Sequence, residues 1–274
     1  MDNLRIKQNF TKKVLVHIVS FKQFIPLKQL HRSPYAEILC YPKFDRKELQ
    51  IRLEELGQLD VTVIAFTGKK SVLNMPILGK GCVGIVVKAF IDAEVVALKI
   101  RRTDANRTEM KHEAEMLKIA NSLNIGPKLI NMSKNFLLME FVEGQLFPGW
   151  LEVVKSKQRI RNVLRFTLEQ CWQLDKAGLD HGELSRAPKH IIVKNNDVPC
   201  IVDFETASVT RRVSNLTSIC QYFFIANQTA KLMAEKLGVF EGEVLKQVLR
   251  KYKEKMTSEN FEDVLKTVNL TENH

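Results

Sequence analysis

The chain has 274 residues, 45% of them hydrophobic and 27% charged, which is ordinary globular composition with enough apolar residues to bury a core. No apolar run approaches the ~18 residues of a membrane span, and no signal-peptide pattern follows Met1, so we expect neither membrane insertion nor export. Five dispersed cysteines without a C-x-x-C pair predict free thiols in a reducing, cytoplasmic compartment, and the net charge of +11 favours anionic partners.

The first 35 residues form a basic arm, with seven Lys and Arg residues against a single acidic one, Asp2. Such an arm can contact RNA or a ribonucleoprotein by neutralising phosphates. A basic, solubilising surface explains the same charges, and the aromatic residues Phe10, Phe21 and Phe24 also suit the apolar face of a short packed segment. The composition favours the solubilising surface, and contact with RNA stays the alternative.

Residues 1–70 are predicted to form an N-terminal α/β appendage. A helix is expected over 45–56, because Asp45 can cap it and apolar residues recur on one face, at Leu49, Leu53 and Leu56. Gly57 is placed to end this helix. The β-branched run 61–66 then predicts a strand.

Three glycines at G-x-G-x-x-G spacing, Gly79, Gly81 and Gly84, stand between two strand-like segments. Because glycine has no Cβ, such a turn can lie close over a polyphosphate. The following strand carries Val-Ala-Leu-Lys and ends at Lys99, which matches the phosphate-pairing lysine of the protein-kinase signature. A strand rather than a helix after the glycines argues against a dinucleotide-binding turn. The sequence therefore predicts a phosphate cover with Lys99 as its cation.

The remaining elements alternate as in a sheet with one helix, followed by a helical region. Residues 71–142 are predicted to run strand, glycine loop, strand, turn, strand, helix, strand and strand, with the helix over about 107–123. Residues 143–274 are predicted to be mostly helical, with two short strands near 191–193 and 201–202.

A carboxylate on the predicted helix can form an ion pair with Lys99 and hold it extended. Glu113 is favoured over Glu109 and Glu115, because the apolar pair Met116-Leu117 turns the Glu113 face inward.

Three later motifs extend the pattern: Met139-Glu140-Phe141-Val142-Glu143-Gly144 is like a kinase hinge, His181-Gly182-Glu183-Leu184 like a catalytic loop, and Asp203-Phe204-Glu205 like D-F-G. Over about residues 72–230 the chain resembles the protein-kinase superfamily, specifically its compact archaeal RIO-like branch and the related small kinase of the KEOPS complex. The resemblance implies an α+β, two-lobed fold, with an antiparallel N-lobe sheet and one helix at 71–142. A compact, mostly helical C-lobe without an activation segment would follow at 143–274.

The resemblance also implies where ATP and its metal ion bind. Val86 and Ala97 would pack on one face of the adenine ring, and Ile192 would pack on the other face. Main-chain groups of Glu140 and Val142 would bind the adenine edge, with Met139 behind them. Asp203 would hold Mg²⁺ on the phosphates, since carboxylate oxygens suit that ion.

The catalytic loop departs from the family pattern at two positions. Glu183 stands where the family has aspartate, and its extra methylene moves the carboxylate by on the order of 1 Å. Pro188 stands at the position of the metal-binding asparagine, and His190, after a loop that looks two residues longer, takes the equivalent place. Histidine is a better ligand for Mn²⁺ or zinc than for Mg²⁺. His190 can therefore be a metal ligand, a phosphate contact or a buried structural residue, and these alternatives stay open.

Glu205 replaces the glycine of D-F-G, which argues against a mobile backbone switch. It can be a second metal ligand or the salt-bridge partner of Arg211 or Arg212. Arg101, Arg102 and Arg107 follow Lys99 closely, and they either read an anionic substrate or coat the surface.

The leading functional expectation is an atypical, RIO-like kinase that transfers the γ-phosphoryl of ATP, with Mg²⁺ or Mn²⁺, to a Ser or Thr hydroxyl of a protein. One alternative is a slow ATPase that switches a ribonucleoprotein complex. Another is a pseudokinase that binds ATP and acts as a scaffold, because Glu183 and Pro188 depart from the catalytic pattern.

Overall fold

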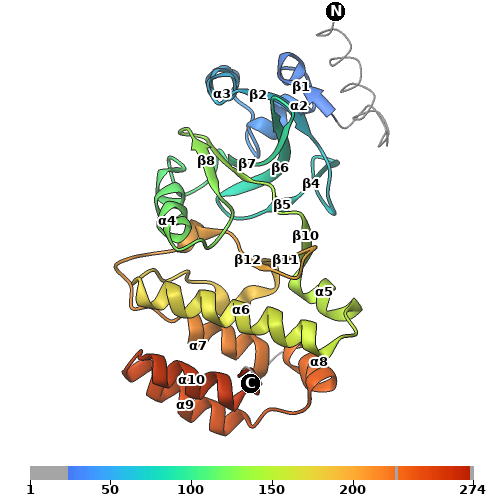
Figure 1. The fold of residues 1–274 in the computed structure, drawn as a ribbon. Helices are drawn as coiled ribbons and strands as arrows, with labels where there is room; N and C mark the ends of the chain where they lie inside the picture. Colours follow the sequence, from blue (N-terminus) through green and yellow to red (C-terminus); the bar gives the residue numbers. More distant parts are fainter. Residues whose placement is uncertain (1–23, 226–227, 272–274) are drawn as a thin grey trace, which may run out of the picture. The chain divides into compact units, whose positions relative to one another are not determined.

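Antiparallel strands and helices alternate along the chain, which confirms the α+β class (Figure 1). The computed structural model describes residues 24–225 and 228–271, so most of the basic arm lies outside the described residues. Contacts within the chain divide it into unit 1, residues 1–106, and unit 2, residues 107–274. None of the described helices is long and apolar enough to cross a bilayer.

Unit 1 is built on an antiparallel sheet in which β1, β2, β6 and β7 are successive neighbours and the short β5 pairs with β6. A separate hairpin joins β3 and β4. Strand β2, from the predicted appendage, thus continues the sheet that carries the glycine motif. The elements are β1 (Phe24–Pro26), η2 (Leu27–Gln29), α2 (Tyr35–Leu39), α3 (Arg46–Gln58), β2 (Val61–Ala65), β3 (Lys70–Val72), β4 (Met75–Ile77), β5 (Gly79–Lys80), β6 (Gly84–Ile91) and β7 (Glu94–Arg101).

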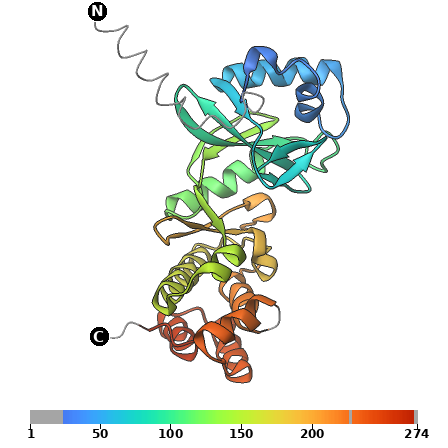
Figure 2. The same cartoon turned by 90° about the vertical axis from the view of Figure 1, so that its right-hand side faces the viewer.

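Helix α3 begins as predicted and ends later than predicted. The side chain of Asp45 accepts a hydrogen bond from Glu48 N at 2.8 Å, so it caps the first turn. The expected end at Gly57 is wrong, because the helix runs on to Gln58 and the left-handed turn falls at Asp60, with φ of 56°. Aspartate tolerates this conformation better than most residues. Helices α2 and α3 pack together beside β2 (Figure 2).

A fully buried arginine ties α3 to the end of β7. The Nη1 atom of Arg52 donates to Arg101 O at 2.7 Å and to Leu39 O, and its Nε lies 2.8 Å from Glu48 Oε1. A buried guanidinium is costly unless it is paired and hydrogen-bonded, as it is here. The network therefore anchors the strand that carries Lys99 to the predicted appendage.

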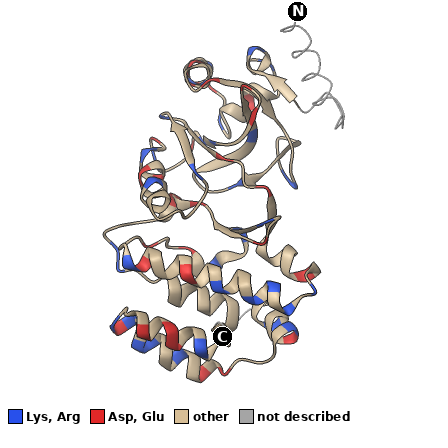
Figure 3. Ribbon diagram, viewed as in Figure 1, with Lys and Arg blue, Asp and Glu red and all other residues tan. Residues whose placement is uncertain are grey.

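Unit 2 combines one helix with a β-hairpin, a small three-stranded sheet and a set of helices. Strands β8 and β9 pair, and β10, β11 and β12 form the second sheet in that order. Helices α9 and α10 pack against each other and carry both signs of charge on their surfaces (Figure 3). The elements are α4 (Lys111–Ser122), β8 (Leu129–Met132), β9 (Phe136–Glu140), β10 (Gly144–Leu146), α5 (Phe147–Val153), α6 (Lys157–Lys176), η3 (Leu184–Lys189), β11 (Ile191–Lys194), β12 (Pro199–Ile201), η4 (Phe204–Thr206), α7 (Asn215–Cys220), the π-helical turn η5 (Gln221–Ile225), α8 (Gln228–Leu237), α9 (Gly242–Glu254) and α10 (Ser258–Thr267).

The predicted helix over 107–123 is present but begins at Lys111, because Met110 N donates to Lys134 O at 3.0 Å instead of continuing a helix backward. A buried carboxylate joins three helices of the same unit. Asp175 on α6 accepts hydrogen bonds from Asn215 and Leu216 N at the start of α7, and from Tyr252 Oη on α9 at 3.0 Å. These bonds fix α7 and α9 against the long helix α6.

Candidate active site

The glycine motif of unit 1 forms a tight hairpin turn between β5 and β6. Gly79 lies opposite Val86 in the register, and Gly81 N donates to Gly84 O at 2.8 Å. A Cβ added to Gly84 would lie 2.9 Å from Ile100 O and 3.0 Å from Lys99 Cγ. Only glycine therefore lets β6 begin this close to Lys99.

The register of β6 and β7 puts three predicted site residues on one face of the sheet. Val86 lies opposite Lys99, and Ala97 lies opposite Lys88, so Val86, Ala97 and Lys99 share a face. The alternate residues, such as Val87 and Leu98, are buried on the other face. Lys99 itself is only 4% exposed. Within unit 1, the expected grouping around the lysine is therefore present.

Two of the arginines after Lys99 serve the internal structure of unit 1. Arg101 is buried, and its Nη2 lies 3.4 Å from Glu48 Oε1. Arg102 pairs with Asp104 at 2.7 Å and donates to Gly81 O, which braces the glycine turn. These two residues do not form a free basic cluster.

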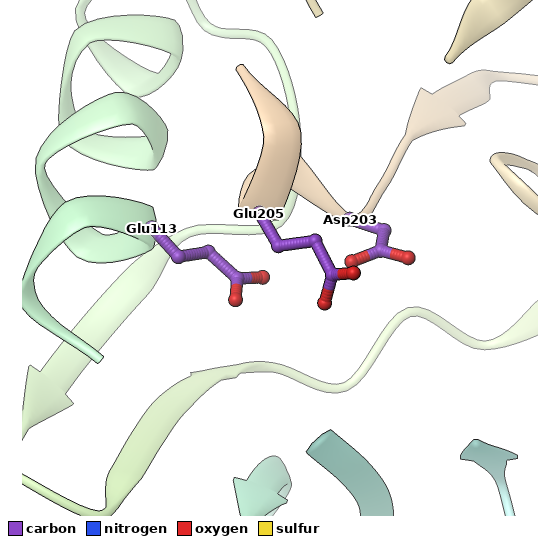
Figure 4. Close-up of side chains that lie close together, drawn as sticks. All are labelled: Glu113, Asp203 and Glu205. Carbon is purple, nitrogen blue, oxygen red and sulfur yellow. The ribbon is translucent and has the colours of Figure 1, made fainter. Parts of the chain in front are cut away.

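Unit 2 gathers three carboxylates, from Glu113 on α4 and from Asp203 and Glu205 around η4 (Figure 4). One oxygen from each lies within 4.8 Å of the others, and Glu113 and Glu205 are buried. The inward position of Glu113 is confirmed, since Glu109 and Glu115 are exposed. The sequence did not predict that Glu113 and Glu205 meet, because their positions along the chain are far apart.

Arg211 and Arg212, the alternative salt-bridge partners expected for Glu205, contact other groups. Arg211 Nε lies 2.5 Å from Asp180 Oδ2, and Arg212 Nη2 donates to Lys253 O. Asp180 also accepts a hydrogen bond from Ser214 N at 2.9 Å and is buried. It therefore has a structural role.

Close packing holds the Asp203 turn against α4. A Cβ on Gly126 would lie 3.0 Å from both Leu117 and Phe204, so glycine lets the helix and the turn approach. His112 on the same helix contacts Ala207 O at 2.9 Å. Asp203 itself has φ of 72°, a left-handed conformation that most residues avoid. These contacts fix the carboxylates beside one another.

Three carboxylates at this separation repel one another unless a cation lies among them. A donor set made only of oxygen atoms suits Mg²⁺ or Mn²⁺ better than zinc. Asp203 and Glu205, with Glu113 beside them, therefore fit a hard divalent ion.

The residues of the predicted catalytic loop in unit 2 meet at His190, whose side chain is fully buried. Its Nε2 lies 2.8 Å from Glu183 Oε2, and its Nδ1 lies 3.8 Å from Asp203 Oδ2. The contact with Glu183 is short but is not aligned as a full hydrogen bond. Burial lowers the pKa of His190, although the two carboxylates oppose this effect. Pro188 lies exposed on η3 and offers no ligand.

His181 packs against the residues on both sides of Asp203. Its Nε2 contacts Val202 O at 3.1 Å, and its ring packs on Phe204 with centroids 5.0 Å apart. Burial, with a smaller contribution from His190, lowers the pKa of His181 to about 4. A neutral, buried imidazole of this kind is a structural support.

The predicted adenine-binding residues of unit 2 lie on two strands. Met139 and Glu140 end β9, Val142 follows it, and Ile192 lies on the half-buried side of β11. Glu140 N donates to Lys128 O at 2.8 Å, so a main-chain contact from Glu140 to adenine would have to use its carbonyl oxygen. The Glu140 side chain pairs with Lys194 at 3.0 Å. The pairing of Lys99 with Glu113 and the roles of all these residues stay predictions.

Comparison with known protein families gives a match for the central part of the chain. The family model of the RIO domain matches residues 87–216, a range that includes Lys99, Glu113, Glu183, His190 and Asp203. The comparison with curated proteins gave no match. RIO domains belong to the atypical protein kinases, which indicates ATP binding and phosphoryl transfer. The antiparallel sheet and the helical region agree with that fold. Residues 87–216 thus match the RIO domain, which is consistent with a RIO-like atypical member of the protein-kinase superfamily.

Proposed function

We propose that the protein transfers the γ-phosphoryl group of ATP to a Ser or Thr hydroxyl of a protein. The observation that carries this proposal is the series of contacts in unit 2 from Glu183 through His190 to Asp203. A proton acceptor and a metal-binding carboxylate are the two groups that a kinase loop must provide.

Phosphoryl transfer depends mainly on positioning and on neutralising charge. In unit 1, the turn with Gly79, Gly81 and Gly84 would cover the phosphates, and Lys99 would pair with them. Val86 and Ala97 would contact adenine.

In unit 2, Asp203 and Glu205 would hold the divalent ion, which neutralises the developing charge of the phosphates. Glu183 would accept the proton of the acceptor hydroxyl. Main-chain groups near Glu140 and Val142, with Met139 and Ile192, would bind the base.

A slow ATPase remains the second candidate because Glu183 replaces aspartate. A carboxylate that reaches a water molecule better than a protein hydroxyl would release phosphate instead of labelling a protein. In that case the basic arm would hold the protein on an RNA or ribonucleoprotein partner.

The test is incubation of the purified chain with γ-labelled ATP and Mg²⁺ or Mn²⁺, followed by measurement of labelled protein and of free phosphate. Label on Ser or Thr that disappears in Lys99→Ala and Asp203→Ala supports the kinase. Free phosphate without labelled protein supports the ATPase. A thermal shift with ATP and neither product would leave only a nucleotide-binding scaffold. Asp197→Ala is the matched control for Asp203→Ala. Asp197 also has a positive φ, of 61°, but it lies in the turn between β11 and β12, whereas Asp203 follows the other end of β12.

A further inference from the structure

The catalytic loop of unit 2 brings one buried imidazole between two carboxylates. His190 faces Glu183 with Nε2 at 2.8 Å and Asp203 with Nδ1 at 3.8 Å. Only the first distance is within hydrogen-bonding range. A neutral imidazole has one N–H, and by distance we assign that proton to Nε2, the nitrogen beside Glu183, although the N–H is not aligned with the carboxylate as a full hydrogen bond.

The backbone holds His190 in register with Asp203. His190 O accepts a hydrogen bond from Val202 N at 2.9 Å, and the O atom of Val202 contacts His181 Nε2. Val202 is therefore fixed on both sides, immediately before the metal-binding candidate. The backbone of His190 is thereby held, and its side chain is fully buried, so the imidazole is a rigid support for Glu183.

The carboxylate of Glu183 is contacted at one oxygen. His190 Nε2 and Lys189 Nζ lie 2.8 Å and 3.7 Å from Oε2. Among the described residues, no hydrogen bond or ion pair reaches Oε1. The Glu183 side chain is also 32% exposed, so a substrate can approach it.

We propose that His190 is a positioning residue that anchors Oε2 of Glu183 and leaves Oε1 for the proton of the acceptor. A glutamate side chain is longer than aspartate by one methylene, and a misplacement of about 1 Å can cost roughly a hundredfold in rate. The histidine after the lengthened loop compensates for that extra length. This inference rests on the proposed phosphoryl transfer, and it gives Glu183 a defined geometry within it.

Two variants separate the two nitrogens of His190. In His190→Gln the side-chain amide nitrogen reaches about as far as Nε2 and can still donate to Glu183. His190→Asn keeps a polar atom near the position of Nδ1, facing Asp203, and is too short to reach Glu183. For each full-length variant, the initial rate of phosphate release and self-labelling is measured with ATP and Mg²⁺, together with the Kd for ATP by calorimetry and the Tm.

His190→Asn should lower kcat by roughly 10- to 100-fold, with the Kd for ATP within about twofold of the original protein, because only the base is displaced. His190→Gln should stay within about threefold. In a Glu183→Gln background, His190→Asn should add less than about twofold, since both changes act through one contact.

Three results would overturn the proposal. Equal losses of kcat in both variants would show that Nε2 does not position Glu183. A normal kcat in His190→Asn with a reduced kcat in His190→Gln would instead show that Nδ1 binds a metal ion. A parallel loss of ATP binding and Tm would make His190 merely structural.

A measurement independent of activity distinguishes this proposal from the proposed function. The chain has only 6 histidines, so ¹⁵N-imidazole NMR can resolve His190, with His190→Gln identifying its signals. We expect an Nε2–H tautomer whose signal moves in Glu183→Gln more than that of any other histidine. If the original protein neither releases phosphate nor labels protein, phosphoryl transfer fails while this contact is still tested. An unmoved His190 signal overturns the positioning role.

Discussion

The glycine hairpin of unit 1 and the catalytic loop of unit 2 differ in how closely they follow the kinase pattern. The hairpin retains every glycine of the motif. Gly84, the last of them, lies close against Lys99 on the neighbouring strand β7. The loop has Glu183, Pro188 and His190 at the positions that depart from the pattern, and the side chains of Glu183 and His190 are in contact. We therefore expect changes in the two regions to disturb nucleotide binding and phosphoryl transfer separately.

The largest effect is expected at the proposed base. Glu183→Gln keeps the size of the side chain but removes its ability to take a proton. We expect kcat to fall on the order of 10²–10⁴-fold, with ATP affinity unchanged, as for removal of a general base. Rates of label transfer and phosphate release, with calorimetry of ATP binding, check this.

Lys189→Met is the control for Glu183→Gln, because Lys189 contacts the same oxygen only at 3.7 Å and is half exposed. It should change kcat by less than about threefold. Full activity in Glu183→Gln would show that the loop does not supply the base, and the contrast between the two regions would then fail.

A smaller effect is expected at the acidic cluster. Glu205→Gln should weaken binding of Mn²⁺ in the presence of ADP by roughly 10- to 100-fold, because a neutral amide replaces one of three neighbouring carboxylates. Electron paramagnetic resonance of free and bound Mn²⁺ measures this directly. Glu115→Gln, an exposed change on α4, is the matched control and should leave Mn²⁺ affinity alone. Equal affinities in both variants would exclude Glu205 as a ligand.

A change in the glycine hairpin should weaken ATP binding more than it lowers kcat. In Gly84→Ala the new methyl group would lie too close to Ile100 O, so the start of β6 and Lys99 must separate by tenths of an ångström. We expect about a tenfold weaker Kd for ATP, with a smaller change in kcat. Gly57→Ala is the control, since a Cβ there meets nothing within 4 Å. A fall in kcat larger than the loss of affinity would show that the two regions are not separable.

The same contrast explains what the sequence could predict. Gly79, Gly84 and Lys99 follow from local rules, because glycine spacing and strand alternation depend on neighbours in the chain. The burial of Glu113 follows from helical spacing in the same way. The meeting of Glu113 with Glu205, and of His190 with Glu183, depends on packing between distant segments, which periodicity does not describe. The end of α3 at Gln58 was missed because Gly57 has the residue type that commonly ends a helix, whereas the left-handed turn falls at Asp60.

The smallest effect is expected far from the loop, at the buried hub of unit 2. Tyr252→Phe removes a hydrogen bond of 3.0 Å to Asp175, which should cost about 1–3 kcal/mol of stability and lower the Tm by a few degrees. Catalytic rates below the Tm should not change, so loss of transfer in the loop variants could not be attributed to general loosening of unit 2. Tyr35→Phe in unit 1 is the control, since its ring stacks on Phe66 and its hydroxyl has no hydrogen bond among the described residues.

The loss of stability in Tyr252→Phe should depend on pH in a defined direction. Burial raises the pKa of Asp175 above its usual value, although hydrogen bonds from Leu216, Asn215 and Tyr252 lower it in part. The folded state thus holds the proton of Asp175 more tightly than the unfolded state, and this contribution to stability is lost as the pH rises through the folded pKa. Without the tyrosine hydroxyl the folded pKa rises further. Tyr252→Phe should therefore destabilise the protein more in neutral than in acidic buffer, and thermal unfolding that shows the opposite order would mean that the bond favours the protonated carboxyl.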